Sequence, residues 1–142
     1  MVSSEPPVHE PSPAAAGRRL LDRLIAEFAV FRDGQPLAIG IDKQLLARLP
    51  DLDRKLLRVA LGMHTRSLRY LKMTARATLR YDLDGKPEGE VLPEHRSRAA
   101  QLVEARLQQQ AAQRKAQREA EALAQRRTLK LHQLVEKFGR NR

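Results

Sequence analysis

The segment "LGMHTRSLRYLKMT", residues 61–74, gathers several side chains that are able to do chemistry. His64 and Ser67 are of the types that act as base and nucleophile in hydrolases. Arg69 and Tyr70 are of the types that hold phosphates and stack on unpaired bases in nucleic-acid-binding proteins. The segment is therefore a candidate for catalysis, a candidate for nucleic-acid binding, or only the polar side of an ordinary helix.

Catalysis has little support in the sequence. No third residue is evident that would orient His64 toward Ser67. Neither "GxxxxGK" nor "GxGxxG" occurs, so the usual phosphate-binding loops are missing. The other histidines show no metal-ligand spacing with His64: His9, His95 and His132. We therefore expect no enzyme, no metal and no cofactor, and we expect His64 to be a packed, hydrogen-bonded residue on the core side of its helix.

Charge favours a polyanionic partner. The 142 residues include 27 Lys and Arg against 17 Asp and Glu, a net charge of +10. Residues 54–80 carry eight of these cations and no acid: Arg54, Lys55, Arg58, Arg66, Arg69, Lys72, Arg76 and Arg80. A solvated surface usually mixes the two signs, whereas an uninterrupted positive stretch is typical of a phosphate-binding face. Composition thus favours nucleic acid first and an anionic membrane second.

A helix from about Thr65 to Thr74 is expected to present this chemistry. Thr65 suits the N-cap, and the free amides of residues 65–67, up to Ser67, would form an anion site. At about 100° per residue, one side collects three apolar residues that should face the core: Leu68, Leu71 and Ala75. The opposite side, turned to solvent, collects Arg66, Arg69, Tyr70 and Met73. The alternative is an amphipathic helix with a surface tyrosine.

Shorter helices are expected before this one. Residues 1–17 hold four of the eight prolines and are interpreted as a disordered arm. Apolar spacing predicts helices at 18–31, 43–49 and 54–64, separated by Gly and Pro. The expected caps are Asp42 for the second helix and Asp51 or Asp53 for the third.

A small β-hairpin is predicted over residues 79–92, "LRYDLDGKPEGEVL". Asp84-Gly85 is the turn signal, and Gly89 suits a second positive-φ position or a bulge. The carboxylates of this segment lack the spacing of an EF-hand calcium loop and are better explained as turn formers: Asp82, Asp84 and Glu88.

One long basic helix is predicted from Pro93 to about Lys137. Residues 93–142 hold 12 Lys and Arg against 5 acids, and their apolar stripe fades after Leu107. This pattern indicates a projecting helix without sustained heptads. A last apolar patch, able to pack back or to bind a protein partner, follows near its end: Leu129, Leu131, Leu134, Val135 and Phe138.

The expected compartment is the cytoplasm, and no membrane partner is expected. No cysteine is present, so disulfides are excluded. The first residues, "MVSSEPPVHEPSPAAAG", carry two acids, no Lys or Arg and no apolar core, unlike a signal peptide. Apolar runs are far shorter than the roughly 20 residues that span a bilayer.

Three motifs together resemble a known family. They are "PLAIGI" at 36–41, "HTRSLRYL" at 64–71, and "RYDLDGKPEGEV" at 80–91 followed by "EHR". Over roughly residues 20–107 the chain resembles the ProQ/FinO family of bacterial RNA chaperones. The resemblance implies a FinO-like α+β domain, mainly α with a small β-hairpin, whose concave face grips an RNA hairpin and its single-stranded 3′ end.

The resemblance also implies roles for individual residues. Tyr70 should contact the terminal nucleotides, with Thr65 and the helix start near the terminal phosphate, and Arg80 at the same pocket. Arg54 and Arg58 match cations that flank the duplex. Three positions depart from the family by lacking a cation: Ala38, Gly62 and Ala100. The cations that would compensate are Arg66, Lys72, Arg76 and Arg98.

The function expected from these observations is that of an RNA chaperone. It would bind terminator-like hairpins, stabilise small RNAs and promote RNA–RNA pairing, as a monomer. The expected domains are an arm at 1–17, an RNA-binding domain at 18–107 and a basic helical tail at 108–142. Two alternatives stay open: a helix-turn-helix DNA-binding regulator using Arg58 to Tyr70, and a scaffold whose long C-terminal helix binds a protein.

Overall fold

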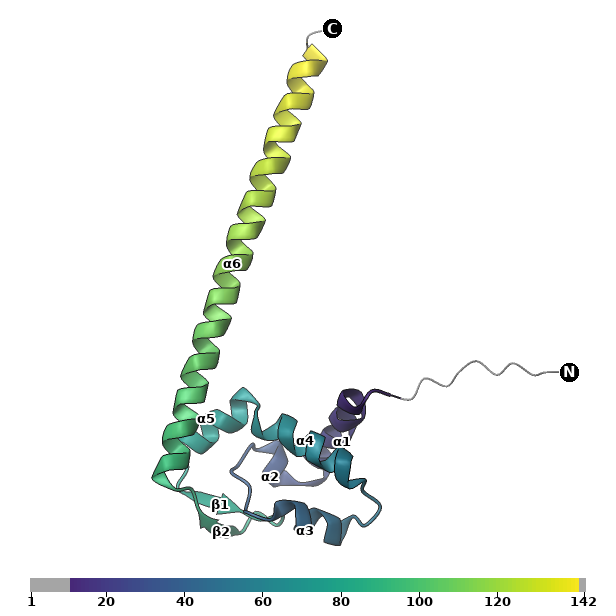
Figure 1. Cartoon of the computed structure of the whole chain (residues 1–142), viewed down its shortest axis with the longest axis vertical. Helices are drawn as coiled ribbons and strands as arrows, with labels where there is room; N and C mark the ends of the chain where they lie inside the picture. Colours follow the sequence, from purple (N-terminus) through teal and green to yellow (C-terminus); the bar gives the residue numbers. More distant parts are fainter. Residues whose placement is uncertain (1–10, 141–142) are drawn as a thin grey trace, which may run out of the picture. The chain divides into compact units, whose positions relative to one another are not determined.

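The computed structural model describes residues 11–140 and is mainly helical, with one two-stranded antiparallel sheet (Figure 1). The expected fold class is confirmed. The elements are α1 (Pro13–Glu27), α2 (Ala29–Arg32), α3 (Ile41–Arg48), α4 (Arg54–Thr65), α5 (Leu68–Arg76), β1 (Leu79–Tyr81), β2 (Pro87–Glu90) and α6 (Pro93–Arg140). The described chain divides into two units, up to Val103 and from Glu104, which are treated separately.

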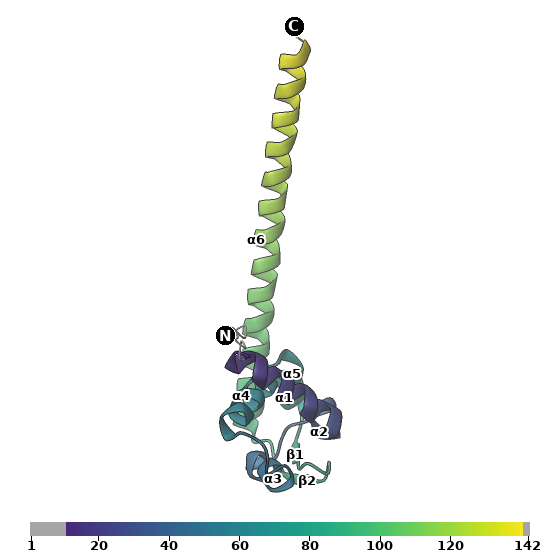
Figure 2. The ribbon, with the colours of Figure 1, turned by 90° about the vertical axis from the view of Figure 1, so that its right-hand side faces the viewer.

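Helix α1 begins earlier than predicted. The Ser12 hydroxyl accepts the Ala15 N–H at 3.2 Å, and Pro13 occupies the first turn, where its missing N–H costs nothing. Residues 13–17 of the arm predicted over 1–17 are therefore helical, and residues 1–10 lie outside the described residues. Both ribbon views show α1 alongside α4 (Figures 1 and 2).

The helix predicted over 18–31 is interrupted at Phe28. This residue has φ −122° and ψ 123°, an extended conformation that ends α1 and starts α2 in a new direction. Val30 is buried as well as Phe28 and Phe31, whereas in one straight helix Val30 would lie about 200° around the axis from Phe28 and so on the opposite side. Burial of two aromatic rings outweighs the loss of a few helical hydrogen bonds.

The next two helices confirm one predicted cap and correct another. Gly40, with φ +84°, precedes α3, and Asp42 lies in the first turn of that helix instead of capping it. Asp53 caps α4 by accepting the Lys55 N–H at 2.8 Å. The most fully buried large side chains come from several elements and include Phe31, Leu24, Leu45, Leu57 and Val91.

The predicted β-hairpin is present, and a segment from far earlier in the chain lies along it. Strands β1 and β2 pair antiparallel with an irregular register, and Gly89 has φ +90° at the irregularity. Leu37 forms a parallel bridge with Tyr81, where the Ala38 N–H donates to the Tyr81 carbonyl at 2.9 Å. The motif "PLAIGI" is thereby fixed against β1.

Helix α6 covers the predicted range and continues to Arg140. In the second unit its apolar patch is exposed, with Phe138 at 73% of its full accessibility. Among the helices within residues 11–140, none has the length and apolarity needed to cross a bilayer.

Candidate nucleic-acid interface

The junction between α4 and α5 differs from the prediction, because Ser67 is the N-cap and Thr65 is not. Helix α4 continues through Thr65, whose hydroxyl donates to the Leu61 carbonyl of the preceding turn at 2.9 Å. The Ser67 hydroxyl accepts the Tyr70 N–H at 3.2 Å and donates to the His64 carbonyl at 2.7 Å. The Ser67 hydroxyl thus pairs with a backbone carbonyl at the end of α4 and with a backbone N–H at the start of α5, so α5 begins at Leu68.

Tyr70 is buried, contrary to the prediction that it faces solvent. Only 7% of the residue is accessible, and its hydroxyl accepts the Leu37 N–H at 3.2 Å. The buried arc of α5 is Tyr70, Leu71 and Thr74. The sequence pattern placed the core on the leucine side alone, since it gave no sign that residues 36–38 cover the neighbouring side.

Arg80 holds the same backbone segment. Its guanidinium donates to the Leu37 carbonyl at 3.0 Å, and its other terminal nitrogen lies 3.2 Å from His95 Nδ1. Both polar groups of Leu37 are thus engaged, one by Tyr70 and the other by Arg80. We call these two residues the loop-holding pair, because they fix the loop from which Ile39 projects with 82% accessibility.

His64 lies in an aromatic column, as a packed core residue. Its ring centroid is 4.9 Å from that of Phe31 and 5.2 Å from that of Tyr70. Burial, and second the positive charge of Arg69, lower the pKa of His64 to about 4. Its buried Nε2 has no hydrogen-bond partner within residues 11–140, so the packing predicted for it is confirmed and the hydrogen bond at this nitrogen is not.

Arg54 and Arg58 line a groove between the start of α3 and α4. The groove has a volume of about 460 Å³ and is floored by leucines, and its rim also carries Lys43, which sequence reasoning missed. Within residues 11–140, neither Arg54 nor Arg58 makes a side-chain hydrogen bond or ion pair. We call this feature the α3–α4 groove, and its cations are available to a ligand.

The remaining predicted cations are distributed over other surfaces of the first unit. Lys72 and Arg76 line a second groove, of about 420 Å³, against the start of α6. Arg98 and His95 line a third, at the first turns of α6. The predicted site residues are therefore not gathered in one pocket.

Arg66 and Arg69 are exposed beside two glycines. The Arg66 guanidinium lies against Gly62, where an added Cβ would be 3.1 Å from its terminal nitrogen. The stem of Arg69 passes over Gly34, where an added Cβ would be 3.4 Å away and the backbone has φ +66°. Gly62, which the family pattern marks as a lost cation, thus gives Arg66 its place.

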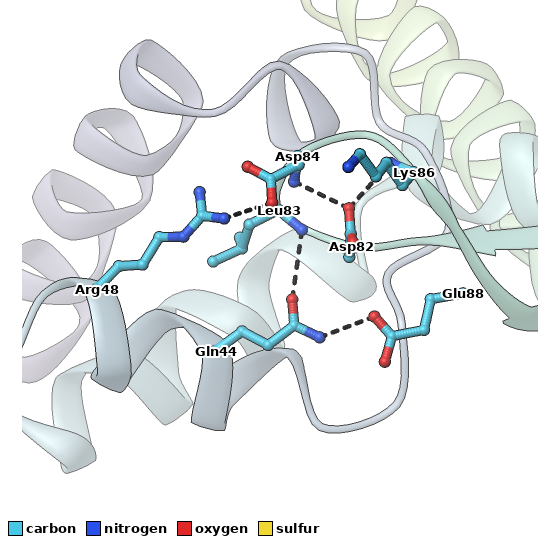
Figure 3. Close-up of polar contacts among 7 residues, drawn as sticks. All are labelled: Gln44, Arg48, Asp82, Leu83, Asp84, Lys86 and Glu88. Carbon is cyan, nitrogen blue, oxygen red and sulfur yellow. Dashed lines mark hydrogen bonds and ion pairs between the residues drawn. The ribbon is translucent and has the colours of Figure 1, made fainter.

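A polar contact set fixes the hairpin tip to α3 (Figure 3). Gln44 donates to Glu88 at 3.1 Å and accepts the Leu83 N–H at 3.4 Å, while Arg48 pairs with Asp84. The hydrogen bond from Arg48 lowers the pKa of Asp84. Asp82 accepts the N–H groups of the turn at 2.9 Å, which confirms its role as a turn former. We call the Arg48–Asp84 and Gln44–Glu88 contacts the hairpin clamp.

The described residues contain no metal-binding group. Within residues 11–140, no three His, Asp or Glu side chains are placed to hold a metal ion. The features that sequence reasoning missed are Lys43, Ile39 and the hairpin clamp. Their only sequence signals were the "GI" after Ile39, which marks a loop, and the opposite charges of Arg48 and Asp84.

Comparison with known proteins identifies relatives over the first unit and the start of the second. A model of the ProQ/FINO family matches residues 14–117. The RNA chaperone ProQ of Shewanella oneidensis is 40% identical over 86 residues, which are 58% of this chain and 40% of that protein. The RNA chaperone ProQ of Pseudoalteromonas atlantica is 40% identical over 83 residues, 56% of this chain and 38% of that protein. The chain thus spans about two fifths of the length of these curated relatives.

Solved structures agree with this match. A FinO-like RNA chaperone from Neisseria meningitidis has a TM-score of 0.61 at 39% identity, covering 72% of this chain and 85% of that one. A ProQ homologue from Legionella pneumophila has a TM-score of 0.51 at 27% identity, covering 75% of this chain and 93% of that one. The family model covers well over half of the residues, and the chain therefore belongs to the ProQ/FINO family.

Proposed function

We propose that the chain is a non-catalytic RNA-binding protein that acts as an RNA chaperone in the cytoplasm. It binds structured RNAs that end in a hairpin and a single-stranded 3′ tail, stabilises small RNAs and promotes pairing between RNAs. The observation that carries the proposal is the acid-free positive stretch of residues 54–80 in a domain whose named relatives are RNA chaperones. Phosphates would be held by arginines, and recognition would depend on the shape and the end of the RNA.

The available cations support this proposal better than the aromatic residue does. Arg54 and Arg58 are exposed one helical turn apart, without a carboxylate partner within residues 11–140. Such cations release counterions from a nucleic acid on binding, which makes the affinity salt-dependent. Tyr70, in contrast, is buried, so we assign it a supporting role and not direct stacking on a base.

The test is a competition between two ligands at fixed salt. A labelled RNA hairpin with a 3′ tail of several nucleotides is mixed with the full chain, and the unlabelled competitor is either the same RNA or a DNA duplex of equal length. Preference for the tailed RNA is expected. Preference for the DNA duplex would favour a helix-turn-helix regulator and would overturn the proposal.

A strand-annealing assay tests the chaperone activity separately from binding. Two complementary structured RNAs are mixed with and without the chain, and faster duplex formation is expected with it. Binding without acceleration would leave an RNA-binding protein that is not a chaperone. A second preparation ending near residue 110 measures what the basic tail contributes to RNA binding. The masses of both preparations in solution check the expected monomer and the effect of the tail on it.

A further inference from the structure

We propose that the α3–α4 groove is a subsite for one unpaired nucleotide, whose base lies on the leucine floor and whose phosphate is held by Arg54 and Arg58. This inference rests on the proposed RNA-binding function and deepens it. It differs from a role for these arginines in contacting only a duplex, because a paired base cannot enter a groove.

The floor of the groove is apolar. Leu57 is buried, and Leu46 and Leu61 are half-buried with side chains that line the groove. Contact with leucine side chains does not stabilise a charged phosphate. The flat face of a nucleobase, in contrast, is stabilised on such a floor, because both surfaces are removed from water. The floor therefore indicates a ligand with a flat, weakly polar part.

The rim of the groove is cationic. Arg54 and Arg58 are four residues apart on α4 and so point from the same side of that helix, while Lys43 approaches from α3. Asp42 is the one carboxylate of the lining and lies on the α3 side. A phosphate is expected at the α4 side, and Asp42 is positioned to accept a hydrogen bond from an amino or imino group of a base.

The size of the groove suits one such group. Its volume of about 460 Å³ lies in the range of about 300–1,000 Å³ that is typical of small-ligand sites. A double helix, roughly 20 Å wide from the dimensions of its grooves, does not fit. Together the floor, the rim and the size point to a nucleotide with its base unpaired.

The experiment is a mutant cycle between the groove and the RNA. Abasic sites replace each tail nucleotide of the hairpin RNA in turn, and affinities are measured for wild type and for Leu46→Trp, which fills the groove. One position should lose at least several-fold in affinity for wild type, because an abasic site leaves no base to cover the leucine floor. The same replacement should cause no further loss in Leu46→Trp. An equal loss in both proteins, or no sensitive position for wild type, would overturn the subsite.

Controls separate this result from failure of the proposed function or of the fold. If wild type does not bind the intact tailed RNA, the proposed function fails and the subsite fails with it. Leu102→Trp adds the same ring at an exposed position outside the groove and should keep the abasic penalty. Circular dichroism checks that each variant is folded.

A second cycle uses exposed residues, in case Leu46→Trp does not fold. A neutral methylphosphonate linkage replaces the phosphate of the sensitive nucleotide, and the variants are Arg58→Gln and the control Arg19→Gln on α1. Wild type and Arg19→Gln should lose several-fold in affinity with the neutral linkage, and Arg58→Gln should not. An equal loss in Arg58→Gln would place that phosphate elsewhere and overturn the assignment.

A final arm distinguishes an RNA nucleotide from a free one. Adenosine or uridine monophosphate at micromolar concentration should leave binding of the tailed RNA unchanged, since the tail holds its own base near the groove at a high effective concentration. Displacement of the RNA at that concentration would assign the groove to a free nucleotide and overturn the proposal.

Discussion

The loop-holding pair and the α3–α4 groove contain residues of similar chemistry in opposite situations. Tyr70 and Arg80 direct their polar atoms to the backbone of Leu37. Arg54 and Arg58 direct theirs to no other residue within positions 11–140. A side chain that completes a hydrogen bond inside the fold stabilises the protein, and one without a partner is available to a ligand. The positive stretch therefore contains two functions that composition alone does not separate.

The largest effect is expected from Tyr70→Ala. The substitution removes a buried ring between His64 and the Leu37 backbone and should lower the free energy of unfolding by about 3–5 kcal/mol. Urea unfolding measures this change in stability. RNA affinity should fall only because part of the protein is unfolded and because the loop that carries Ile39 is no longer fixed. Unchanged stability with lost RNA binding would make Tyr70 a direct RNA contact, like the arginines of the groove.

Tyr70→Phe is the matched control for that substitution. It keeps the ring and removes only the hydroxyl that accepts the Leu37 N–H, which should cost about 1 kcal/mol because a buried donor loses its partner. Equal stability of Tyr70→Phe and wild type would show that the hydroxyl does not hold the loop.

A large pH effect is expected from His64, which packs against Tyr70 of the loop-holding pair. Its pKa is about 4 in the fold against an ordinary value near 6.5, so the unfolded chain binds the extra proton between these values. The stability it contributes is present above pH 6.5 and is lost as the pH falls toward 4, by about 3 kcal/mol. The free energy of unfolding, measured with urea, is plotted against pH for wild type and for His64→Leu. Between pH 4 and 6.5 the two slopes should differ by the equivalent of about one proton. Identical slopes would contradict it.

An intermediate effect, on binding alone, is expected from the groove. Arg54→Gln combined with Arg58→Gln should leave the unfolding midpoint near that of wild type, because both side chains are exposed and make no side-chain hydrogen bond or ion pair within residues 11–140. The logarithm of RNA affinity against the logarithm of salt should lose about 0.7–0.9 from the magnitude of its slope, because the one phosphate held by both arginines is no longer contacted. Lys55→Gln with Arg19→Gln removes the same charge elsewhere. An equal change of slope in this control would show that the effect comes from the net charge of the protein and not from the groove.

Local sequence patterns predicted much of the fold, whereas they predicted the surroundings of only some of the site residues. Apolar spacing and turn chemistry predicted α4, the hairpin and α6, since Asp53, Gly85 and Pro93 mark their boundaries within the segment itself. The burial of Tyr70 was not predictable in this way, because the covering segment lies 33 residues earlier in the chain. The break at Phe28 likewise depends on a core that the helix does not contain. Sequence thus located the charged stretch, and only tertiary contacts separated Arg80, which holds the fold, from Arg54 and Arg58, which make no side-chain hydrogen bond or ion pair within residues 11–140.

The smallest effect is expected from the hairpin clamp. Its Arg48 is exposed, like Arg54 and Arg58, but is paired with a carboxylate. Arg48 and Asp84 form an ion pair at the surface, and such pairs contribute little because water and salt screen them. Asp84→Asn should lower the melting temperature slightly at low salt and not at high salt. The pKa of Asp84 is lowered, so the pair stabilises above the ordinary carboxyl pKa and is lost as the pH falls through the folded value. Arg18→Gln, which breaks a pair within α1, is the control. A change in RNA affinity with Asp84→Asn but not with Arg18→Gln would show that the hairpin position matters to binding, and a paired arginine would then serve function as well as fold.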